Sequence, residues 1–191
     1  MKLLLGSQSP RRRELLAGLD IPFSVVEIKS GESYPPELTC GDIPLYISRE
    51  KAQAYLPQLQ PEELLITADT IVWLNGKMLG KPANEAEARR MLHLLSGRTH
   101  QVYTGVTFTY YNNYKPVMQS IVDCTDVTFR GLSDEEIDYY VEKYKPLDKA
   151  GAYGVQEYIG YIGVSRMAGS YFNVMGFPIG PVYEFLKHFR F

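Results

Sequence analysis

The sequence has few of the residues that build disulfide frameworks or zinc sites. Its 191 residues include two cysteines, Cys40 and Cys124, and three histidines. No histidine stands at ligand spacing from a cysteine, so we expect reduced thiols, no zinc and a cytoplasmic location. The opening "MKLLLG" is too short for a signal-peptide core, and no apolar run is long enough to cross a membrane. We therefore expect a soluble protein without membrane contact.

Several common nucleotide and hydrolase motifs are also absent. The chain has no Walker motif, no G-x-G-x-x-G fingerprint and no G-x-S-x-G elbow. A net charge of −2 argues against broad nucleic-acid binding, which favours a basic domain. A hydrophobic content of 45% and a charged content of 22% are typical of a globular protein. The length suits one domain over residues 1–191.

Short apolar runs alternate with helical patterns along the chain. Strands are predicted at 3–6, 23–28 and 63–74, with a turn at Asn75-Gly76, and as a long hairpin within 100–129 that turns near 112–116. Helices are predicted at 10–18 and 45–56, with Ser9 and Asp42 as their caps, and from Pro178. Two more are predicted after a cap at Asn84 and after a capping box of Ser133 and Glu136. This order predicts an α/β or α+β domain around a mixed sheet.

The segment "SQSPRRR", residues 7–13, places three arginines in the first turn of a predicted helix. Positive charge is unfavourable there, because the free N–H groups already carry partial positive charge. A bound phosphate would compensate, since a helix N-terminus and guanidinium groups both bind anions. At most two of three consecutive side chains can face one site, and we select Arg11 and Arg12 over Arg13. The alternative is a solvated helix face.

Asp69 lies in "TADTIV", inside an otherwise apolar strand. A carboxylate there is costly unless it is paired or binds a cation, so it suits a metal ligand or a general base. The alternative is an aspartate that caps a turn. Lys51, Lys81 and Glu32, each taken alone, are equally consistent with ordinary solvated residues.

The segment "DKAGAYGVQ", residues 148–156, contains two glycines that allow a ligand to approach the backbone closely. The Gln156 amide offers both a donor and an acceptor, which matches the edge of uracil or thymine. A tight turn without a ligand is the alternative. His100 stands apart from any serine or cysteine nucleophile, and we interpret it as structural.

Taken in order, "SQSPRR", "EKA", "ADTIV", "GKP", "SGRTHQVYTG", "DKAGAYGVQ" and "NVMGFP" resemble the Maf family of nucleoside triphosphate pyrophosphatases over nearly the whole chain. The resemblance implies an α/β fold related to inosine-triphosphate pyrophosphatases, with a mixed central sheet and a cleft between two lobes. It implies hydrolysis between the α and β phosphorus atoms with Mg²⁺ or Mn²⁺, and a homodimer.

The resemblance also implies roles for individual residues. The proton acceptor falls on Asp69. The "AYGVQ" segment resembles the branch that acts on dTTP and UTP rather than on 7-methyl-GTP. The remaining positions are Arg11, Thr70 and Gln156 for substrate specificity, Arg12, Lys51 and Lys81 for the phosphates, and Glu32 with Asp69 for the metal.

Two other functions are compatible with parts of the pattern. A nucleotide-sensing regulatory protein linked to septum formation would bind nucleotide with little turnover, but it would not need Asp69. A purine-specific pyrophosphatase would share the chemistry, but Gln156 and "AYGV" argue against it. The sequence leaves open whether the substrate is a normal or a modified pyrimidine triphosphate.

Overall fold

The computed structural model describes residues 1–31 and 33–191, so the predicted metal ligand Glu32 lies outside the described residues. The described chain forms a seven-stranded sheet in the order β2-β1-β3-β5-β6-β7, with β4 paired to β3. Strand β1 is parallel to β2 and β3, whereas β4 and β7 run antiparallel to β3 and β6. The predicted mixed α/β fold is confirmed. The strands are β1 Lys2–Gly6, β2 Phe23–Val25, β3 Glu63–Leu74, β4 Lys77–Leu79, β5 Thr99–Asn112, β6 Lys115–Phe129 and β7 Val164–Ala168.

Helices connect and cover the strands. They are α1 Pro10–Ala17, α2 Asp42–Tyr55, α3 Glu85–Leu95, α4 Asp134–Tyr144, α5 Tyr158–Gly163, α6 Tyr171–Val174 and α7 Ile179–Leu186, with short 3-10 helices at Leu56–Gln58 and Ala150–Ala152. Asn84 caps α3 by accepting from the Glu87 N–H at 2.9 Å, as predicted. The predicted capping box of Ser133 and Glu136 is also present at α4. Among the described residues, no helix is long and apolar enough to cross a membrane.

Three local predictions differ from the structure. Ser9 stands at the N-cap position of α1, but its own N–H donates to Ser7 Oγ at 3.2 Å and its hydroxyl makes no capping bond to the described residues. Helix α2 has Gly41 at its N-cap, so Asp42 is its first helical residue rather than its cap. Strand β2 ends at Val25, three residues earlier than predicted.

The chain divides into two compact units, in agreement with the two lobes that the resemblance implies. The first unit consists of Met1–Asp69, Thr104–Asp123 and Gly176–Phe191. The second unit consists of Thr70–Tyr103 and Cys124–Met175. Strands β3, β5 and β6 each contribute residues to both units.

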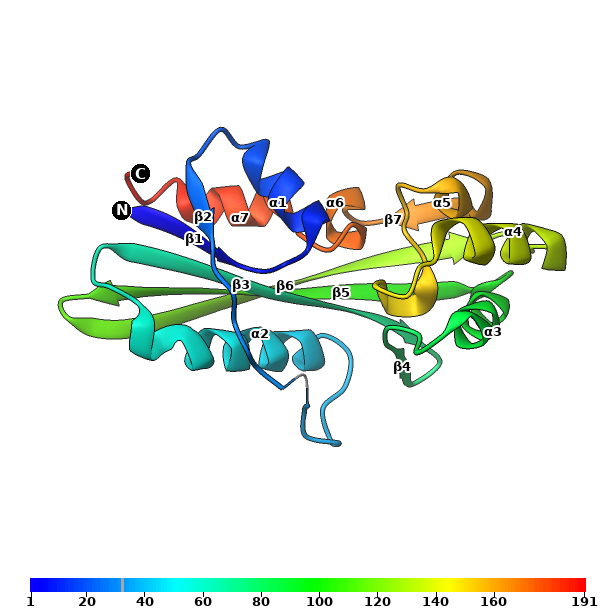
Figure 1. Cartoon of the computed structure of the whole chain (residues 1–191), viewed down its shortest axis with the longest axis horizontal. Coiled ribbons are helices and arrows are strands. Elements are labelled where there is room, and N and C mark those ends of the chain that lie inside the picture. The colour runs from blue at the N-terminus through cyan, green and yellow to red at the C-terminus, as the bar shows by residue number, and fades with distance from the viewer. Residues whose placement is uncertain (32) are drawn as a thin grey trace. The chain divides into compact units, whose positions relative to one another are not determined.

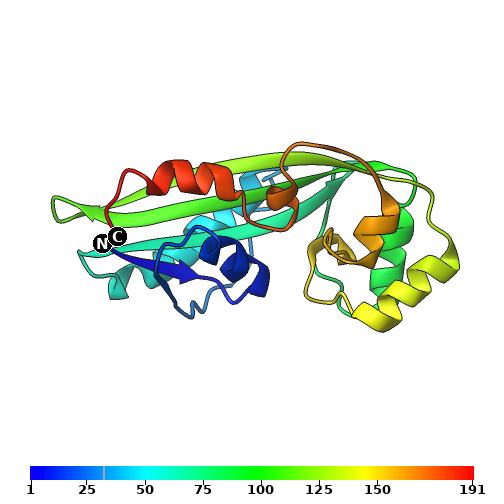
Figure 2. The same cartoon turned by 90° about the horizontal axis from the view of Figure 1, so that it is seen from above.

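In the first unit, helix α2 covers one face of the sheet, and α1 and α7 cover the other (Figure 1). Side chains of a strand alternate between its two faces. Leu64 and Ile66 of β3 therefore pack toward Leu16 of α1 and Val182 of α7, whereas Leu65 joins a separate cluster on the face of α2. The chain ends lie side by side, and the Met1 amino group donates to the carbonyl of Arg190 (Figure 2).

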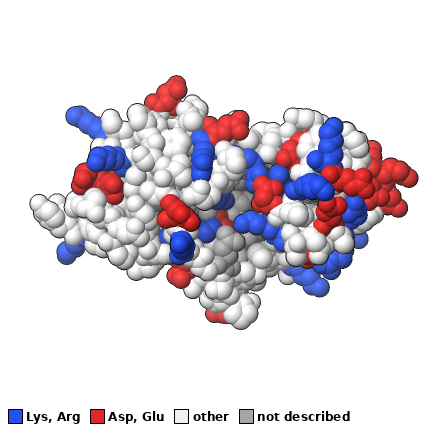
Figure 3. All heavy atoms as spheres, viewed as in Figure 1, with Lys and Arg blue, Asp and Glu red and all other residues white. Residues whose placement is uncertain are grey.

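In the second unit, α3, α4 and α5 enclose an apolar core. Leu92 of α3, Ile137 of α4 and Ile159 of α5 are fully buried in it. Acidic and basic side chains gather over α3 and α4 on the face shown in Figure 3. Arg89 of α3 forms an ion pair with α4, in which its Nε donates to Asp138 Oδ1 at 2.7 Å. Such exposed pairs contribute little to stability because solvent screens them, so the apolar core is the main source of stability in this unit.

His100 is a buried histidine in the core of the second unit. Its ring is 1% exposed, with Nε2 at 2.7 Å from the Tyr153 hydroxyl and an edge-to-face contact with Phe129. Burial lowers the pKa of His100 from 6.5 to about 4, because the charged ring is poorly solvated there. The ring is therefore neutral at pH 7, which agrees with the structural interpretation of this residue.

This lowered pKa predicts a loss of stability in mild acid. The unfolded chain takes up the proton near pH 6.5, whereas the folded protein resists it until about pH 4. The stabilisation is thus complete above pH 6.5 and is lost as the pH falls toward 4. Between pH 7.5 and 4.5 the loss is about 2.5 kcal/mol. Urea unfolding of the wild type and His100→Gln at both pH values measures it, and an equal pH dependence of the two proteins would contradict it.

Candidate active site

The turn between β1 and α1 forms the first part of the site. Strand β1 ends at Gly6, which lies opposite Thr67 of the parallel strand β3. A Cβ on Gly6 would lie 2.4 Å from Ile28 Cδ1, so the Ile28 side chain would have to move to make room for a larger residue at this turn. Ser7 follows and is buried, and α1 begins at Pro10. A helix N-terminus that follows a parallel strand is a favourable place for a phosphate group.

Arg12 fixes this turn to two other parts of the first unit. Its Nε donates to the carbonyl of Gly176 at 2.8 Å, and its Nη1 donates to the carbonyl of Ala68 at 3.0 Å and to Ser7 Oγ at 3.3 Å. Arg12 therefore has a structural role that the sequence did not indicate. Its predicted role as a phosphate ligand stays a prediction.

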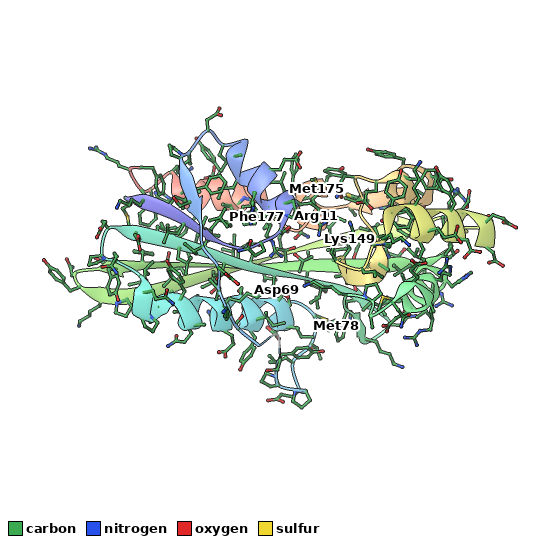
Figure 4. All side chains as sticks on the ribbon, in the orientation of Figure 1. Arg11, Asp69, Met78, Lys149, Met175 and Phe177 are labelled. Atoms are coloured by element: carbon green, nitrogen blue, oxygen red, sulfur yellow. The ribbon has the colours of Figure 1, made fainter. Side chains whose placement is uncertain are left out.

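The two neighbouring arginines have different surroundings. Arg13 is half-buried, and its Nη2 donates to Gln8 Oε1 at 2.6 Å. Arg11 is half-buried at the start of α1, and Asp69 lies on β3 of the same unit (Figure 4).

Lys51 and Asp69 form an ion pair in the first unit. Lys51 Nζ donates to Asp69 Oδ1 at 2.8 Å, and the two side chains are 14% and 15% exposed. Because water is largely excluded, this attraction is stronger than that of a surface pair. The structure thus brings together two predicted site residues that lie 18 positions apart in the chain.

A second contact between α2 and β3 lies beside this ion pair. Ser48 is one helical turn before Lys51, and Thr67 is two residues before Asp69 on the same face of the strand. Thr67 Oγ1 donates to the carbonyl of Ser48 at 2.7 Å. Two successive bonds therefore set the register of α2 against β3, and with it the position of Lys51.

Buried hydroxyl groups hold α2 against β5 and β6 as well. Ser48 Oγ donates to the carbonyl of Leu45 at 2.8 Å and lies 2.8 Å from Thr107 Oγ1, which is 3.0 Å from Ser120 Oγ. Each hydroxyl has one proton. Thr107 therefore donates to Ser48, and Ser120 donates to Thr107. This chain of hydrogen bonds leaves α2 little freedom to shift.

The other predicted residues belong to the second unit. Thr70 follows Asp69 in β3, and strand alternation directs it to the opposite face. Lys81 follows β4 and is exposed. The glycine-rich segment 148–156 is attached nearby, because the Gly151 N–H donates to the carbonyl of Gly80 at 3.0 Å. Gly151 has a φ of +67°, and a Cβ there would lie 2.8 Å from Val72 Cγ2, so only glycine fits.

Gln156 presents a buried acceptor. Its side chain is half-buried, and Oε1 has no hydrogen-bond partner among the described residues. A buried polar atom without a partner is unfavourable, so it favours a ligand that donates a hydrogen bond. The N3–H of uracil or thymine is such a donor.

The described residues do not by themselves form a metal site. Among residues 1–31 and 33–191, no three His, Cys, Asp or Glu side chains are grouped so that they could hold a metal ion. Mg²⁺ is commonly bound by one or two carboxylates together with substrate phosphates. Asp69 provides one such carboxylate, so the donor chemistry fits a substrate-bridged ion.

Three residues with specific polar contacts were not selected from the sequence. In the first unit, Ser7 accepts from Arg12 and from the Ser9 N–H. In the second unit, the buried Lys149 forms an ion pair with the half-buried Glu157 at 3.2 Å. Lys149 stands within a quoted motif, and its apolar and glycine neighbours were a signal that it is buried. Glu157 follows Gln156 directly and gave no such signal.

The strand–turn–helix with its arginines and the lysine-paired carboxylate, all in the first unit, are typical of an α/β protein suited to phosphate ester or anhydride chemistry. The family model described as Maf-like protein matches residues 2–189, and the chain belongs to this family.

Curated relatives match over almost their whole length. A dTTP/UTP pyrophosphatase of Phocaeicola vulgatus is 55% identical over 187 residues, which is 97% of this chain and 95% of that protein. A dTTP/UTP pyrophosphatase of Bacteroides thetaiotaomicron is 54% identical with the same coverage. One from Flavobacterium johnsoniae is 45% identical over 97% of this chain and 93% of that protein. A solved nucleoside-triphosphatase / dITP/XTP pyrophosphatase from Mycobacterium abscessus covers 68% of this chain and 74% of its own, at 15% identity and a TM-score of 0.36, too weak a likeness to bear on the fold.

Proposed function

We propose that this protein hydrolyses dTTP and UTP to the nucleoside monophosphate and pyrophosphate. The ion pair of Lys51 and Asp69 carries the proposal, because it places a fixed carboxylate and a fixed cation next to each other in the first unit. Membership of the Maf family and relatives of the stated name support the reaction. We also propose that residues 1–191 act as one catalytic domain.

The reaction needs a water molecule activated for attack on the α-phosphorus. Asp69 accepts the proton of this water, since a carboxylate has two oxygens and Lys51 uses one lone pair of Oδ1. The new P–O bond forms in line with the bond that breaks between the α-phosphorus and the bridging oxygen, and pyrophosphate leaves. Lys51 and Arg11 neutralise the phosphate charge, assisted by Arg12 and Lys81.

The base and the metal complete the proposal. Gln156 Oε1 accepts from the N3–H of the base, while Thr70 and Arg11 contribute to specificity. Asp69 would hold Mg²⁺ or Mn²⁺ together with the substrate phosphates, and Glu32 is the proposed second ligand. When bound, the ion neutralises charge on the phosphate oxygens. A cytoplasmic location and a homodimer stay predictions.

The nucleotide-sensing alternative is not favoured. A sensor needs phosphate-binding cations and a base pocket, but it needs no proton acceptor beside them. The Lys51–Asp69 pair fixes a carboxylate next to a cation, and this carboxylate would reduce the binding of a triphosphate in a protein that did not use it for chemistry.

Product analysis tests the proposed function. The wild-type protein is incubated with dTTP, UTP, dCTP and dGTP in the presence of Mg²⁺ or Mn²⁺. We expect dTMP and UMP with pyrophosphate rather than diphosphates with orthophosphate, and rates for dTTP and UTP about tenfold or more above those for the other substrates. Release of orthophosphate, or equal rates for all four, would contradict it.

A further inference from the structure

Lys149 is a buried cation held between two carboxylates in the second unit. The residue is 8% exposed, and its Nζ lies 2.8 Å from Asp148 Oδ1 and 3.2 Å from Glu157 Oε1. Figure 4 shows Lys149 beside the 3-10 helix Ala150–Ala152. A charge so deeply buried is costly unless it is paired, so this arrangement must be tightly maintained. Its geometry links the first and last residues of the segment 149–157.

Tyr140 connects the same carboxylate to the middle of the segment. The Tyr140 hydroxyl donates to Glu157 Oε2 and accepts from the Gly154 N–H at 3.0 Å. Tyr140 is fully buried in α4, and burial, followed by the bond to Glu157, raises the pKa of its hydroxyl. The hydroxyl therefore stays protonated and keeps its donor role. We call Tyr140, Lys149, Gly154 and Glu157 the Glu157 network.

Two glycines show how closely the backbone is packed around this network. A Cβ on Gly154 would lie 2.8 Å from Glu157 Cδ, and a Cβ on Gly160 would lie 1.9 Å from the carbonyl oxygen of Val155. The backbone at Gly154 and Val155 is therefore enclosed by Glu157 on one side and by α5 on the other. Gln156 therefore lies between Val155 and Glu157, and both of these residues are held in place.

We propose that Glu157 is a specificity-determining positioning residue, whose carboxylate holds segment 149–156 so that the Gln156 amide is oriented before the base of the substrate binds. This inference rests on the proposed function, because it concerns recognition of the same pyrimidine base. A preorganised acceptor binds more tightly than one that must be ordered on binding. Since Glu157 acts through the backbone of Gln156, it affects recognition of the base and leaves proton transfer at Asp69 unchanged.

Two conservative substitutions weaken the network in different ways. Glu157→Gln keeps the shape of the side chain but removes its charge, and Tyr140→Phe removes only the hydroxyl that bonds Gly154 and Glu157. Glu142→Gln is the matched control, because this carboxylate lies on the same helix as Tyr140 with its side chain 69% exposed. Thermal unfolding confirms that each variant is folded.

The binding of the two products is measured separately, because dTMP carries the base and pyrophosphate does not. For Glu157→Gln and Tyr140→Phe we expect the Kd of dTMP and the KM of dTTP to rise about tenfold. We expect kcat and the Kd of pyrophosphate to stay within about threefold of wild type. The preference for dTTP over dCTP should also fall, because a mobile amide can turn either its donor or its acceptor to the base.

Hydrogen exchange at the Gly154 amide reports directly on the network. We expect faster exchange there in both variants and wild-type exchange in Glu142→Gln. If exchange rises while the Kd of dTMP and the preference for dTTP stay unchanged, the network is only structural and the inference is wrong. If the affinity for pyrophosphate falls as much as that for dTMP, Glu157 does not act on base recognition alone, and the inference is wrong. A wild-type protein that neither binds dTMP nor hydrolyses dTTP would instead overturn the proposed function, and the inference with it.

Discussion

Replacement of Asp69 by Asn is expected to lower kcat for dTTP hydrolysis by about two orders of magnitude or more. Asn has almost the same shape as Asp, but it cannot accept the proton of the attacking water, and a positioned general base contributes about 10²–10⁴-fold to a rate. The substitution also removes the negative partner of Lys51, which lies at 2.8 Å. Steady-state release of pyrophosphate, with thermal unfolding to confirm the fold, measures the effect.

Two further variants show whether the effect of Asp69→Asn comes from the loss of the proton acceptor. Asp20→Asn removes an exposed carboxylate of the same unit, at a position with a φ of +56° that Asn tolerates, so it should leave kcat unchanged. Lys51→Met removes the cation and keeps the carboxylate, and we expect a higher KM as well as a lower kcat because Lys51 also neutralises phosphate charge. Near-native turnover by Asp69→Asn would show that another group activates the water.

Replacement of Gly105 by Ala is expected to destabilise the protein by about 3 kcal/mol. Gly105 lies in β5 at the point where the first turn of α2 approaches, and a Cβ there would lie 2.5 Å from Leu45 N and 2.6 Å from the carbonyl of Pro44. These are backbone atoms, so α2 must shift to make room. Because a displacement of about 1 Å at a reacting group can lower a rate about 100-fold, the shift of Lys51 should also reduce turnover.

Gly180→Ala is the matched control for this prediction. Gly180 lies in α7 of the same unit, and a Cβ there meets nothing within 4 Å among the described residues. Alanine favours a helix over glycine by about 1 kcal/mol, so Gly180→Ala should be neutral or stabilising. Urea unfolding and pyrophosphate release are measured for both variants. A Gly105→Ala protein with wild-type stability would show that α2 is not held as closely as its hydrogen bonds indicate.

Local signals in the sequence predicted most of the elements. The caps at Asn84 and Ser133 were found because a side chain and its backbone partner lie three residues apart, and the Asn75-Gly76 turn because both residues tolerate positive φ. The prediction that the Ser9 side chain caps α1 was wrong, although it rested on the same kind of local signal. Ser9 has the chemistry of a cap, but its hydroxyl accepts no capping bond from the described residues, and its N–H donates to Ser7 Oγ.

The sequence indicates candidate site residues one at a time, but not how they are arranged in space. The ion pair of Lys51 and Asp69 depends on the register of α2 against β3. That register is set by the bond from Thr67 to Ser48, two residues that lie 19 positions apart in the chain. The position of Glu157 likewise depends on Tyr140 of a different helix. Contacts of this kind follow no periodicity or spacing in a single sequence, so they could not be predicted from it.

The division of the first unit among three chain segments bears on how the protein is made. All of the second unit lies within residues 70–175, whereas the first unit needs Gly176–Phe191 to complete its core and to supply the carbonyl that Arg12 Nε binds. Domains generally fold as units during synthesis, and long-range pairing forms late. A growing chain therefore carries every predicted site residue by Gln156, yet it cannot close the turn around Arg12 until translation has almost ended. An unfinished chain on the ribosome is for this reason expected to be inactive.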